Sequence, residues 1–246
     1  MRVMRAVRLP NRIVMKKVSE STVGRLSIYL RLLTELQREG VHTVSSEDLA
    51  HRSGSTAAQV RKDLSSFGTF GKRGMGYSVD ELVTALRSIL GLERRWSVAL
   101  IGAGRIGAAL MGYQDFRQQG FDIVAVFDSD ERKVGQKWGS TAVRADDELD
   151  DALRNEGIDI AIIAVPGEVA QSVVDRVVGA DVKAILNFAP TKLTVPPGVA
   201  LKNVNMALEL EGLSYALANR EATSRSARRT RPGARVAARQ STRRRK

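Results

Sequence analysis

Apolar side chains recur at helical spacing in the first third of the chain. Between residues 22 and 40 they stand three or four positions apart, and Gly40 then offers a helix end. Two shorter segments follow, and each begins with a hydroxyl residue three positions before a polar partner, as a capping box does. These pairs are Ser45 with Asp48 and Thr56 with Gln59. The pattern predicts three helices in succession.

The second and third of these helices are spaced like a helix-turn-helix unit. Gly54 lies between them as a turn residue that tolerates positive φ, and Val60 offers an apolar anchor on the later helix. Arg61 and Lys62 would then point away from the core, toward base edges or phosphates in a major groove. Taken alone, the same two residues would also fit a solvated helix face.

A glycine-rich segment comes next, at residues 68–79. Its glycines stand between aromatic residues, which is typical of a tight β-hairpin, and Lys72 and Arg73 fall at its tip. Ser78 and Glu81 then open another predicted helix. Together with the two preceding helices, this hairpin predicts a winged helix-turn-helix domain.

From residue 96 to about 203 the pattern changes to apolar runs separated by helical segments. Near-continuous apolar strands of this kind indicate a parallel sheet that is covered on both faces. The runs are residues 97–102, 122–128, 159–165 and 183–189. A last helix is predicted after them, with apolar residues at 206, 210, 213 and 217 on one face. The fold class is therefore α/β, with a helical domain before a Rossmann-type parallel-sheet domain.

The glycines of the first run carry the clearest chemistry. Gly102, Gly104 and Gly107 form a G-x-G-x-x-G pattern between a strand and a helix. In such a pattern the first glycine permits a tight turn, the second lets the backbone approach a pyrophosphate, and the third lets helix and strand pack closely. Asp128 ends the next strand, where a carboxylate accepts the ribose hydroxyls and disfavours a 2′-phosphate. We expect NAD(H) as the cofactor. Arg132 and Lys133, close to that acid, weaken the preference over NADP(H), and a turn needed only for packing is the alternative.

Charge is concentrated at the ends of the chain. The formal net charge is +12, but residues 220–246 hold eleven Arg and Lys and one acid, which leaves +2 on the rest. We expect a basic N-terminal extension at 1–17 and a disordered basic tail at 220–246. The tail would add sequence-independent attraction to phosphates or merely be solvated. There is no cysteine, only two histidines occur, and no apolar stretch approaches the roughly 20 residues of a membrane span. We expect a cytoplasmic protein with no membrane segment, no secretory signal and no metal site.

Hydride transfer to a carbonyl normally requires an acid or base near the nicotinamide. Residues 92–205 contain no histidine, and their tyrosine and lysines form no recognisable catalytic pairing. This favours a regulator with no catalytic residues. The alternatives are an NAD-dependent dehydrogenase, a CoA-binding subunit with an accessory helical domain, or a nonspecific nucleoid protein that acts through its tails.

Several longer motifs resemble those of the redox-sensing transcriptional repressor Rex family. They are AAQVRKDLSSFGTFGKRGMGY, IGAGRIGAALMGY, VFDSD, ILNFAP and NVNMALELEGLSYAL, and with their flanks they span roughly residues 16–218 in the family's order. The resemblance implies a homodimer that binds an inverted-repeat operator when NADH is low and dissociates when NADH binds. It also implies that the last helix is domain-swapped. The expected domains are a winged helix at 18–91, a Rossmann domain at 92–205 and a swapped helix at 206–219.

The resemblance also assigns roles by position. DNA contacts would come from the recognition helix and the wing, through Arg61, Lys62, Ser65, Lys72 and Arg73. The cofactor would be held by Gly102, Ala103, Gly104, Arg105, Ile106, Gly107, Tyr113, Asp128, Val165, Pro166, Phe188, Ala189 and Pro190. Arg25 matches a family arginine that pairs with an acid near the swapped helix in the DNA-bound state.

Two residues depart from the family's common pattern. Asn205 stands where an aspartate is usual, so the charged pair with Arg25 cannot form, although an amide still hydrogen-bonds. Ser66 stands where a tyrosine commonly precedes the phenylalanine, which removes an aromatic side chain from the recognition helix. The first departure bears on the switch, and the second on operator preference or local packing.

Overall fold

The computed structural model describes residues 18–71 and 74–229. The chain divides into two compact units, one ending at Arg95 and the other beginning at Trp96. The predicted boundary at residues 91 and 92 falls in the short link before this division. Lys72 and Arg73, the basic extension at 1–17 and the tail from 230 lie outside the described residues.

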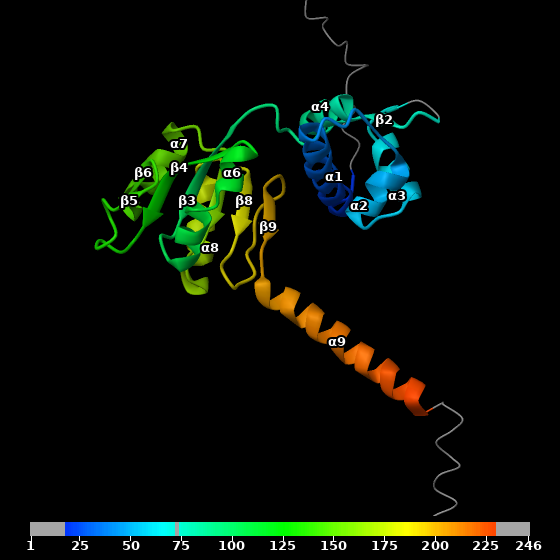
Figure 1. Ribbon diagram of the computed structural model, residues 1–246. Coiled ribbons are helices and arrows are strands. Elements are labelled where there is room, and N and C mark those ends of the chain that lie inside the picture. The colour runs from blue at the N-terminus through cyan, green and yellow to red at the C-terminus, as the bar shows by residue number, and fades with distance from the viewer. Residues whose placement is uncertain (1–17, 72–73, 230–246) are drawn as a thin grey trace, which may run out of the picture. The chain divides into compact units, whose positions relative to one another are not determined.

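The N-terminal unit is a small helical domain with a two-stranded sheet (Figure 1). In chain order its elements are α1 (Glu20–Arg38), β1 (Thr43–Val44), α2 (Ser46–Ser53), α3 (Ala57–Ser65), β2 (Tyr77–Ser78) and α4 (Val79–Ile89). Its core lies between the helices and is built from fully buried side chains, among them Leu26, Leu33, Leu49, Val60 and Leu86. Gly54 ends α2 in the left-handed region at φ 65°, as the predicted turn requires.

The predicted N-caps of this unit are confirmed. The hydroxyls of Ser45, Thr56 and Ser78 each accept a hydrogen bond from the backbone N–H three residues later, at 3.0, 3.2 and 3.4 Å. Each bond satisfies a donor that the first turn of a helix leaves free. These side chains therefore fix where α2, α3 and α4 begin.

The glycine-rich segment differs in detail from the predicted hairpin. Its last residues form β2, and β2 pairs antiparallel with β1, with Thr43 opposite Ser78. Gly71 nevertheless lies directly beside Gly76, since a Cβ on Gly71 would collide with the carbonyl oxygen of Gly76. The ladder thus recruits a strand that lies before α2, which a local pattern of turn residues does not reveal.

The C-terminal unit is a seven-stranded sheet in the order β5-β6-β4-β3-β7-β8-β9. Every adjacent pair is parallel except β5 with β6. The strands are β3 (Trp96–Ile101), β4 (Phe121–Asp128), β5 (Lys137–Trp138), β6 (Thr141–Ala145), β7 (Ile160–Ile163), β8 (Ala184–Asn187) and β9 (Ala200–Asn203). The helical elements are α5 (Arg105–Met111), α6 (Gln114–Gln118), η1 (Asp146–Glu148), α7 (Leu149–Asn155), α8 (Gly167–Gly179) and α9 (Met206–Arg229).

Helices cover both faces of this sheet, as the apolar runs predict (Figure 1). Ala99 and Ile101 of β3 belong to the core on one face, with side chains of α7 and α8. Val98 and Leu100 belong to the core on the other face, with Leu110 and neighbouring side chains of α5 and α6. Successive residues of a strand point to opposite faces, so a strand buried on both sides must be apolar throughout.

Three strands and one helix boundary differ from the sequence expectation. The four predicted runs correspond to β3, β4, β7 and β8, whereas β5 and β9 at the two edges, and β6 beside β5, are short strands that carry polar residues. The last helix continues to Arg229, ten residues past its predicted end, so residues 220–229 are helical where we expected a disordered tail. Alanine, glutamate and arginine are good helix formers, and they supply much of this extension.

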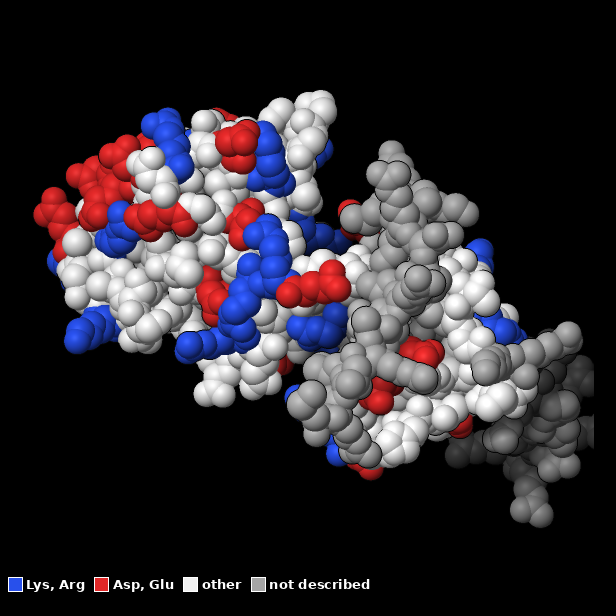
Figure 2. Space-filling model, turned by 90° about the horizontal axis from the view of Figure 1, so that it is seen from above, with Lys and Arg blue, Asp and Glu red and all other residues white. Residues whose placement is uncertain are grey.

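Acidic side chains gather at one end of the C-terminal unit (Figure 2). Asp146, Asp147, Glu148, Asp150 and Asp151 follow one another on η1 and α7. Arg176 bridges Asp146 and Asp150 at 2.7 and 3.1 Å, and Arg144 pairs with Glu148 at 2.9 Å. The acids of this segment outnumber the two arginines that pair with them. Within the described part of the chain, no helix is both long and apolar enough to cross a membrane.

Candidate functional site

The cavity at the carboxyl ends of the C-terminal strands is built around the first glycine turn. It has a volume of about 830 Å³, and its lining includes Gly102, Gly104, Arg105, Ile106, Asp128, Val165, Pro166 and Pro190. In open parallel sheets ligands bind at this edge, where the strand order reverses on either side of the first strand. Here β3 holds that position, between β4 and β7.

Two of the three glycines are required by close backbone contacts. Gly102 has φ 106°, and a Cβ there would collide with the carbonyl oxygen of Ala164. A Cβ on Gly107 would collide with the carbonyl oxygen of Gly102, where helix and strand meet. These contacts confirm the predicted tight turn and close packing.

Gly104 plays a different part. A Cβ built on it meets nothing within 4 Å, and its φ of −87° is open to any residue. The fold therefore does not need a glycine at this position. A ligand whose phosphates pass close to the backbone does need one, because a side chain would occupy that space.

Asp128 is held in place by hydrogen bonds from its own unit. Its Oδ2 accepts hydrogen bonds from the backbone N–H of Ala103 at 2.7 Å and from Lys133 Nζ at 3.0 Å, and its Oδ1 accepts from the N–H of Asp130 at 2.8 Å. The Asp128 side chain is 10% exposed and that of Lys133 33%. Oδ2 already accepts two hydrogen bonds and Oδ1 only one, so Oδ1 keeps a lone pair that can accept a ribose hydroxyl.

The neighbouring charges form a separate pair. Arg132 donates to Asp130 from Nε and Nη2, both at 2.9 Å. The hydrogen bond from this guanidinium lowers the pKa of Asp130 to about 2. Arg132 is therefore neutralised at the surface, whereas Lys133 faces the cavity beside Asp128.

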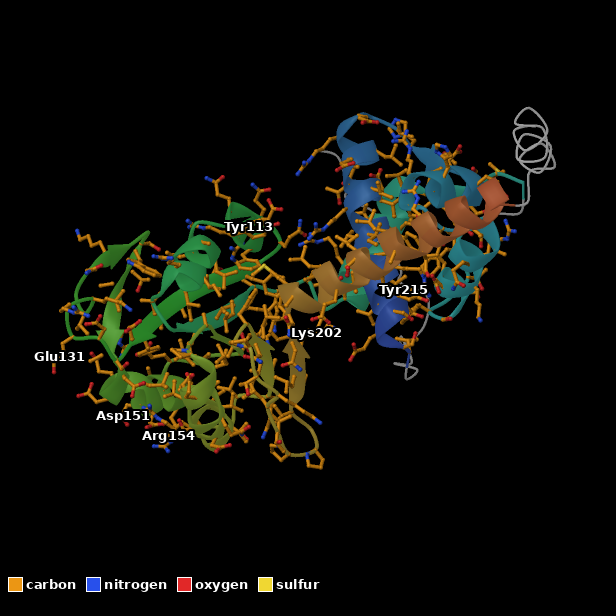
Figure 3. All side chains as sticks on the ribbon, turned by 90° about the horizontal axis from the view of Figure 1, so that it is seen from below. Tyr113, Glu131, Asp151, Arg154, Lys202 and Tyr215 are labelled. Atoms are coloured by element: carbon orange, nitrogen blue, oxygen red, sulfur yellow. The ribbon has the colours of Figure 1, made fainter. Side chains whose placement is uncertain are left out.

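The segment after β8 contributes only part of its predicted set to the cavity. Pro190 lines it, while Ala189 is buried in the sheet core on one face and Phe188 packs against the core on the other. Tyr113 directly precedes α6 and is 48% exposed, with its hydroxyl bonded to Asp115 at 3.1 Å. Figure 3 shows Tyr113 at the surface of this unit, outside the cavity lining, so its place near a nicotinamide stays a prediction.

Sequence reasoning missed several cavity residues that come from α8. Val169, Ser172, Val173 and Arg176 line one wall of the cavity. Their helix follows β7 as the glycine helix follows β3, but nothing in the local sequence marks its residues as functional. Only the parallel arrangement of the two strand-helix units brings both helix starts to the same edge.

The exposed face of α3 forms the second candidate site. Ala58, Arg61, Lys62 and Ser65 are exposed, while Val60, Asp63 and Leu64 are buried. The predicted DNA-contacting residues of this helix thus share its outer face. Arg61 also donates to Ser46 Oγ at 2.8 Å and to Glu47 Oε1 at 3.1 Å, across to the start of α2.

A buried carboxylate, unforeseen from sequence, joins α3 to α1. Asp63 is 2% exposed and accepts from Arg25 Nε at 2.6 Å and Arg25 Nη2 at 2.8 Å. Tyr29 and Gln59 donate to the same carboxylate at 3.2 and 2.7 Å. Burial would raise the pKa of Asp63, but the hydrogen bonds from Arg25 and Gln59 outweigh it and hold that pKa below its usual value.

This pair gives Arg25 a different partner from the one that the family resemblance implies. Its guanidinium already has an acidic partner inside its own unit, and three of its five N–H donors serve Asp63 and Thr22. Asn205 lies directly before α9 and accepts a hydrogen bond from the N–H of Ala207 at 3.0 Å, so it acts as a helix cap. A contact between Arg25 and Asn205 stays a prediction.

Comparison with known proteins shows that both domains of this chain occur together in one protein family. Residues 17–65 match the family model described as "Putative DNA-binding protein N-terminus", and residues 93–191 match the "CoA binding domain" model. The chain is 48% identical to the redox-sensing transcriptional repressor Rex of Carboxydothermus hydrogenoformans, over 81% of this chain and 96% of that protein. The chain belongs to the Rex family. A Rex protein of Streptomyces avermitilis is 44% identical, over 80% of this chain and 79% of its own length.

Solved structures agree with this assignment. A Rex-family repressor, RSP, has been solved with β-NADH, and that structure matches with a TM-score of 0.77 at 38% identity, over 85% of this chain and 99% of that one. The RSP complex with β-NAD⁺ and operator DNA matches with a TM-score of 0.80 at 39% identity, over 88% and 100%. The resemblance found from the sequence motifs is thereby confirmed, as is the predicted order of a DNA-binding domain before a parallel-sheet domain.

Proposed function

We propose that this protein is an NADH-responsive transcriptional repressor that binds an inverted-repeat operator when the NADH/NAD⁺ ratio is low and dissociates when NADH binds. The observation that carries the proposal is the pairing of a dinucleotide-type glycine turn with an exposed helix-turn-helix face in one chain. It is supported by relatives that are named as repressors and by their structures with NADH and with NAD⁺ and operator DNA. Such a protein acts as a cytoplasmic regulator and not as an enzyme.

The cavity residues fit a dinucleotide. The open side of Gly104 leaves room for a pyrophosphate, and Asp128 Oδ1 keeps a lone pair for a hydroxyl of the adenosine ribose. Part of the cavity lining is apolar, with Val165, Pro166 and Pro190. The nicotinamide ring is positively charged in NAD⁺ and neutral in NADH, and burying an unpaired charge is costly. These apolar walls therefore favour the reduced form.

Operator binding would use the outer face of α3. Arg61, Lys62 and Ser65 are exposed there, and Lys72 and Arg73 on the wing would add contacts outside the described residues. An inverted repeat requires two such helices about 34–36 Å apart. A nucleotide that changes this spacing changes operator affinity, and coupling of about 1–3 kcal/mol corresponds to roughly 5- to 150-fold.

The second recognition helix would come from another copy of the chain. Helix α9 exposes Met206, Leu210, Leu213 and Leu217 on one face, each more than half exposed, and Figure 3 shows Tyr215 projecting from the same helix. Burying each of the four would contribute about 1.5–3 kcal/mol. We propose that α9 swaps into a partner subunit and makes the homodimer. Leu213→Asp should give monomers in sedimentation and lose operator binding, whereas Glu211→Gln should stay dimeric.

The switching experiment uses operator DNA selected from a random pool without NADH. Fluorescence anisotropy then follows operator binding with NADH, NAD⁺ or CoA added. Gly104→Val is the matched variant, because its side chain fits the fold and fills the space left for phosphates. We expect micromolar NADH to release the operator from the natural protein and not from Gly104→Val. Unchanged operator affinity in the natural protein would refute the proposal.

The match to the "CoA binding domain" model makes a CoA-binding protein the second candidate. It predicts that CoA binds the cavity and that NADH does not compete with it. A nonspecific nucleoid protein would bind every duplex alike and lose binding steeply with salt. Removing residues 220–246 tests the latter, because specific binding should survive this deletion with a shallower salt dependence.

A further inference from the structure

The buried amide of Asn187 contacts both the loop that follows β8 and the end of β9, the strand that precedes α9. Asn187 is the last residue of β8 and is 1% exposed. Its Oδ1 accepts from the N–H of Ala189 at 2.8 Å. Its Nδ2 lies 2.9 Å from Asn203 Oδ1, 3.2 Å from the carbonyl oxygen of Ala189 and 3.3 Å from that of Thr191. An amide nitrogen has two hydrogens, so one serves Asn203 and the two carbonyls share the other.

This one side chain joins two different segments. The first is the loop at 188–191, whose Pro190 lines the cavity and whose Thr191 side chain lies beside Gly167 at the start of α8. The second is the end of β9, an edge strand that pairs with β8 alone and places Asn203 opposite Asn187. The N–H of Val204 also donates to the Asn187 carbonyl at 2.8 Å. Asn205, the cap of α9, comes next.

The two partners of this contact differ in exposure: Asn187 is buried, whereas Asn203 is exposed. If the loop separates from β9, water can solvate Asn203, but the buried amide of Asn187 loses a partner, so the separation has a free-energy cost. A ligand that displaces Pro190 would therefore carry β9 and the start of α9 with it, or break the contact to Asn203.

We propose that Asn187 and Asn203 are positioning residues that couple the cavity loop to the start of α9. They set how strongly NADH weakens operator binding, without touching nucleotide or DNA. The inference rests on the proposed function, since it names the residues through which that response passes. It adds a connection inside the subunit, from the cavity to the helix that we assign to the dimer.

Asn203→Ala tests the link. It removes only the acceptor at the end of β9, and Asn187 keeps its bonds to Ala189 and Thr191, so the loop stays closed. Asn203→Asp keeps an oxygen acceptor in place. Asn155→Ala removes an exposed asparagine from the end of α7 and serves as the matched control. Operator affinity is measured with and without saturating NADH, and NADH affinity is measured without DNA.

In Asn203→Ala we expect the NADH effect on operator affinity to shrink by about 2- to 12-fold, the range of one hydrogen bond. The separate affinities for operator and for NADH should change by less than about threefold, since neither ligand is contacted. By reciprocity, the effect of operator on NADH affinity should shrink by the same factor. Asn203→Asp and Asn155→Ala should respond as the natural protein does.

The possible failures are distinguishable. If NADH leaves operator binding by the natural protein unchanged, the proposed function itself fails. If the natural protein responds and Asn203→Ala responds equally, the inference is overturned. Loss of the response in Asn203→Asp would overturn it as well, because that variant retains the acceptor. Tryptophan fluorescence from Trp96 and Trp138 checks that the C-terminal unit is folded, and Asn203→Ser replaces Asn203→Ala if it is not.

Discussion

Replacing Asp63 by asparagine should loosen the attachment of the recognition helix to α1. The carboxylate accepts four hydrogen bonds, two of them from Arg25 in a bidentate pair. Breaking a buried pair by removing one charge costs about 3–5 kcal/mol. The Arg25 side chain is 28% exposed, so water can solvate part of the freed guanidinium. We therefore expect Asp63→Asn to lower the free energy of unfolding of the N-terminal unit by about 2–4 kcal/mol.

The pH dependence gives the second half of this prediction. The folded-state pKa of Asp63 lies below its usual value, because hydrogen bonds from Arg25 and Gln59 outweigh the effect of burial. A depressed carboxyl pKa contributes stability that is present above the unfolded pKa, about 3.9, and is lost as pH falls through the folded pKa. The difference between the natural protein and Asp63→Asn should be complete from about pH 5 to 7 and shrink below about pH 4.

Two spectroscopic probes separate the units. Both tryptophans, Trp96 and Trp138, belong to the C-terminal unit, so their fluorescence in urea follows that unit. Far-ultraviolet circular dichroism follows helices in both. We expect Asp63→Asn to shift the dichroism transition and leave the fluorescence midpoint in place, and Glu39→Gln, an exposed acid of the same unit, to shift neither. A loss below about 0.5 kcal/mol, the range of ordinary surface substitutions, would refute the reasoning, as would a difference that does not vary with pH.

Three further outcomes are expected. Glu47→Gln should raise operator affinity by about 2- to 10-fold, because it removes a negative charge and the ionic partner of Arg61. If the variant and the natural protein bind the operator equally well throughout a salt titration, the outer face of α3 is not the DNA-contacting face. Asp128→Asn should weaken NADH binding by about tenfold or more, because a charged acceptor is lost. It should also reduce the preference of the protein for NADH over NADPH. An unchanged NADH/NADPH ratio in fluorescence titrations would contradict this ribose assignment. Gly107→Ala should destabilise the C-terminal unit, since its Cβ meets a backbone carbonyl; an unchanged fluorescence midpoint in urea would disprove that contact.

The local pattern was sufficient for the elements whose signals are local. The hydroxyl residues at 45, 56 and 78 predicted three helix starts, because an N-cap bonds a backbone N–H only three positions away. The apolar runs predicted the four central strands, because a strand buried on both faces has no polar position. Edge strand β9 was not predicted, because three of its four residues are exposed and it carries no apolar run.

The functional assignment required both the sequence motifs and the tertiary structure. The glycine spacing and Asp128 predicted a dinucleotide turn, and the sequence motifs as a set already identified the Rex family. Tertiary structure decided which glycines the fold itself requires, because only the positions of Ala164 and Gly102 show what a Cβ would meet. It also paired Arg25 with Asp63, 38 residues away, and Asn187 with Asn203, 16 residues away. A sequence records which side chains can bond, but the packing of helices and strands selects the partners that meet.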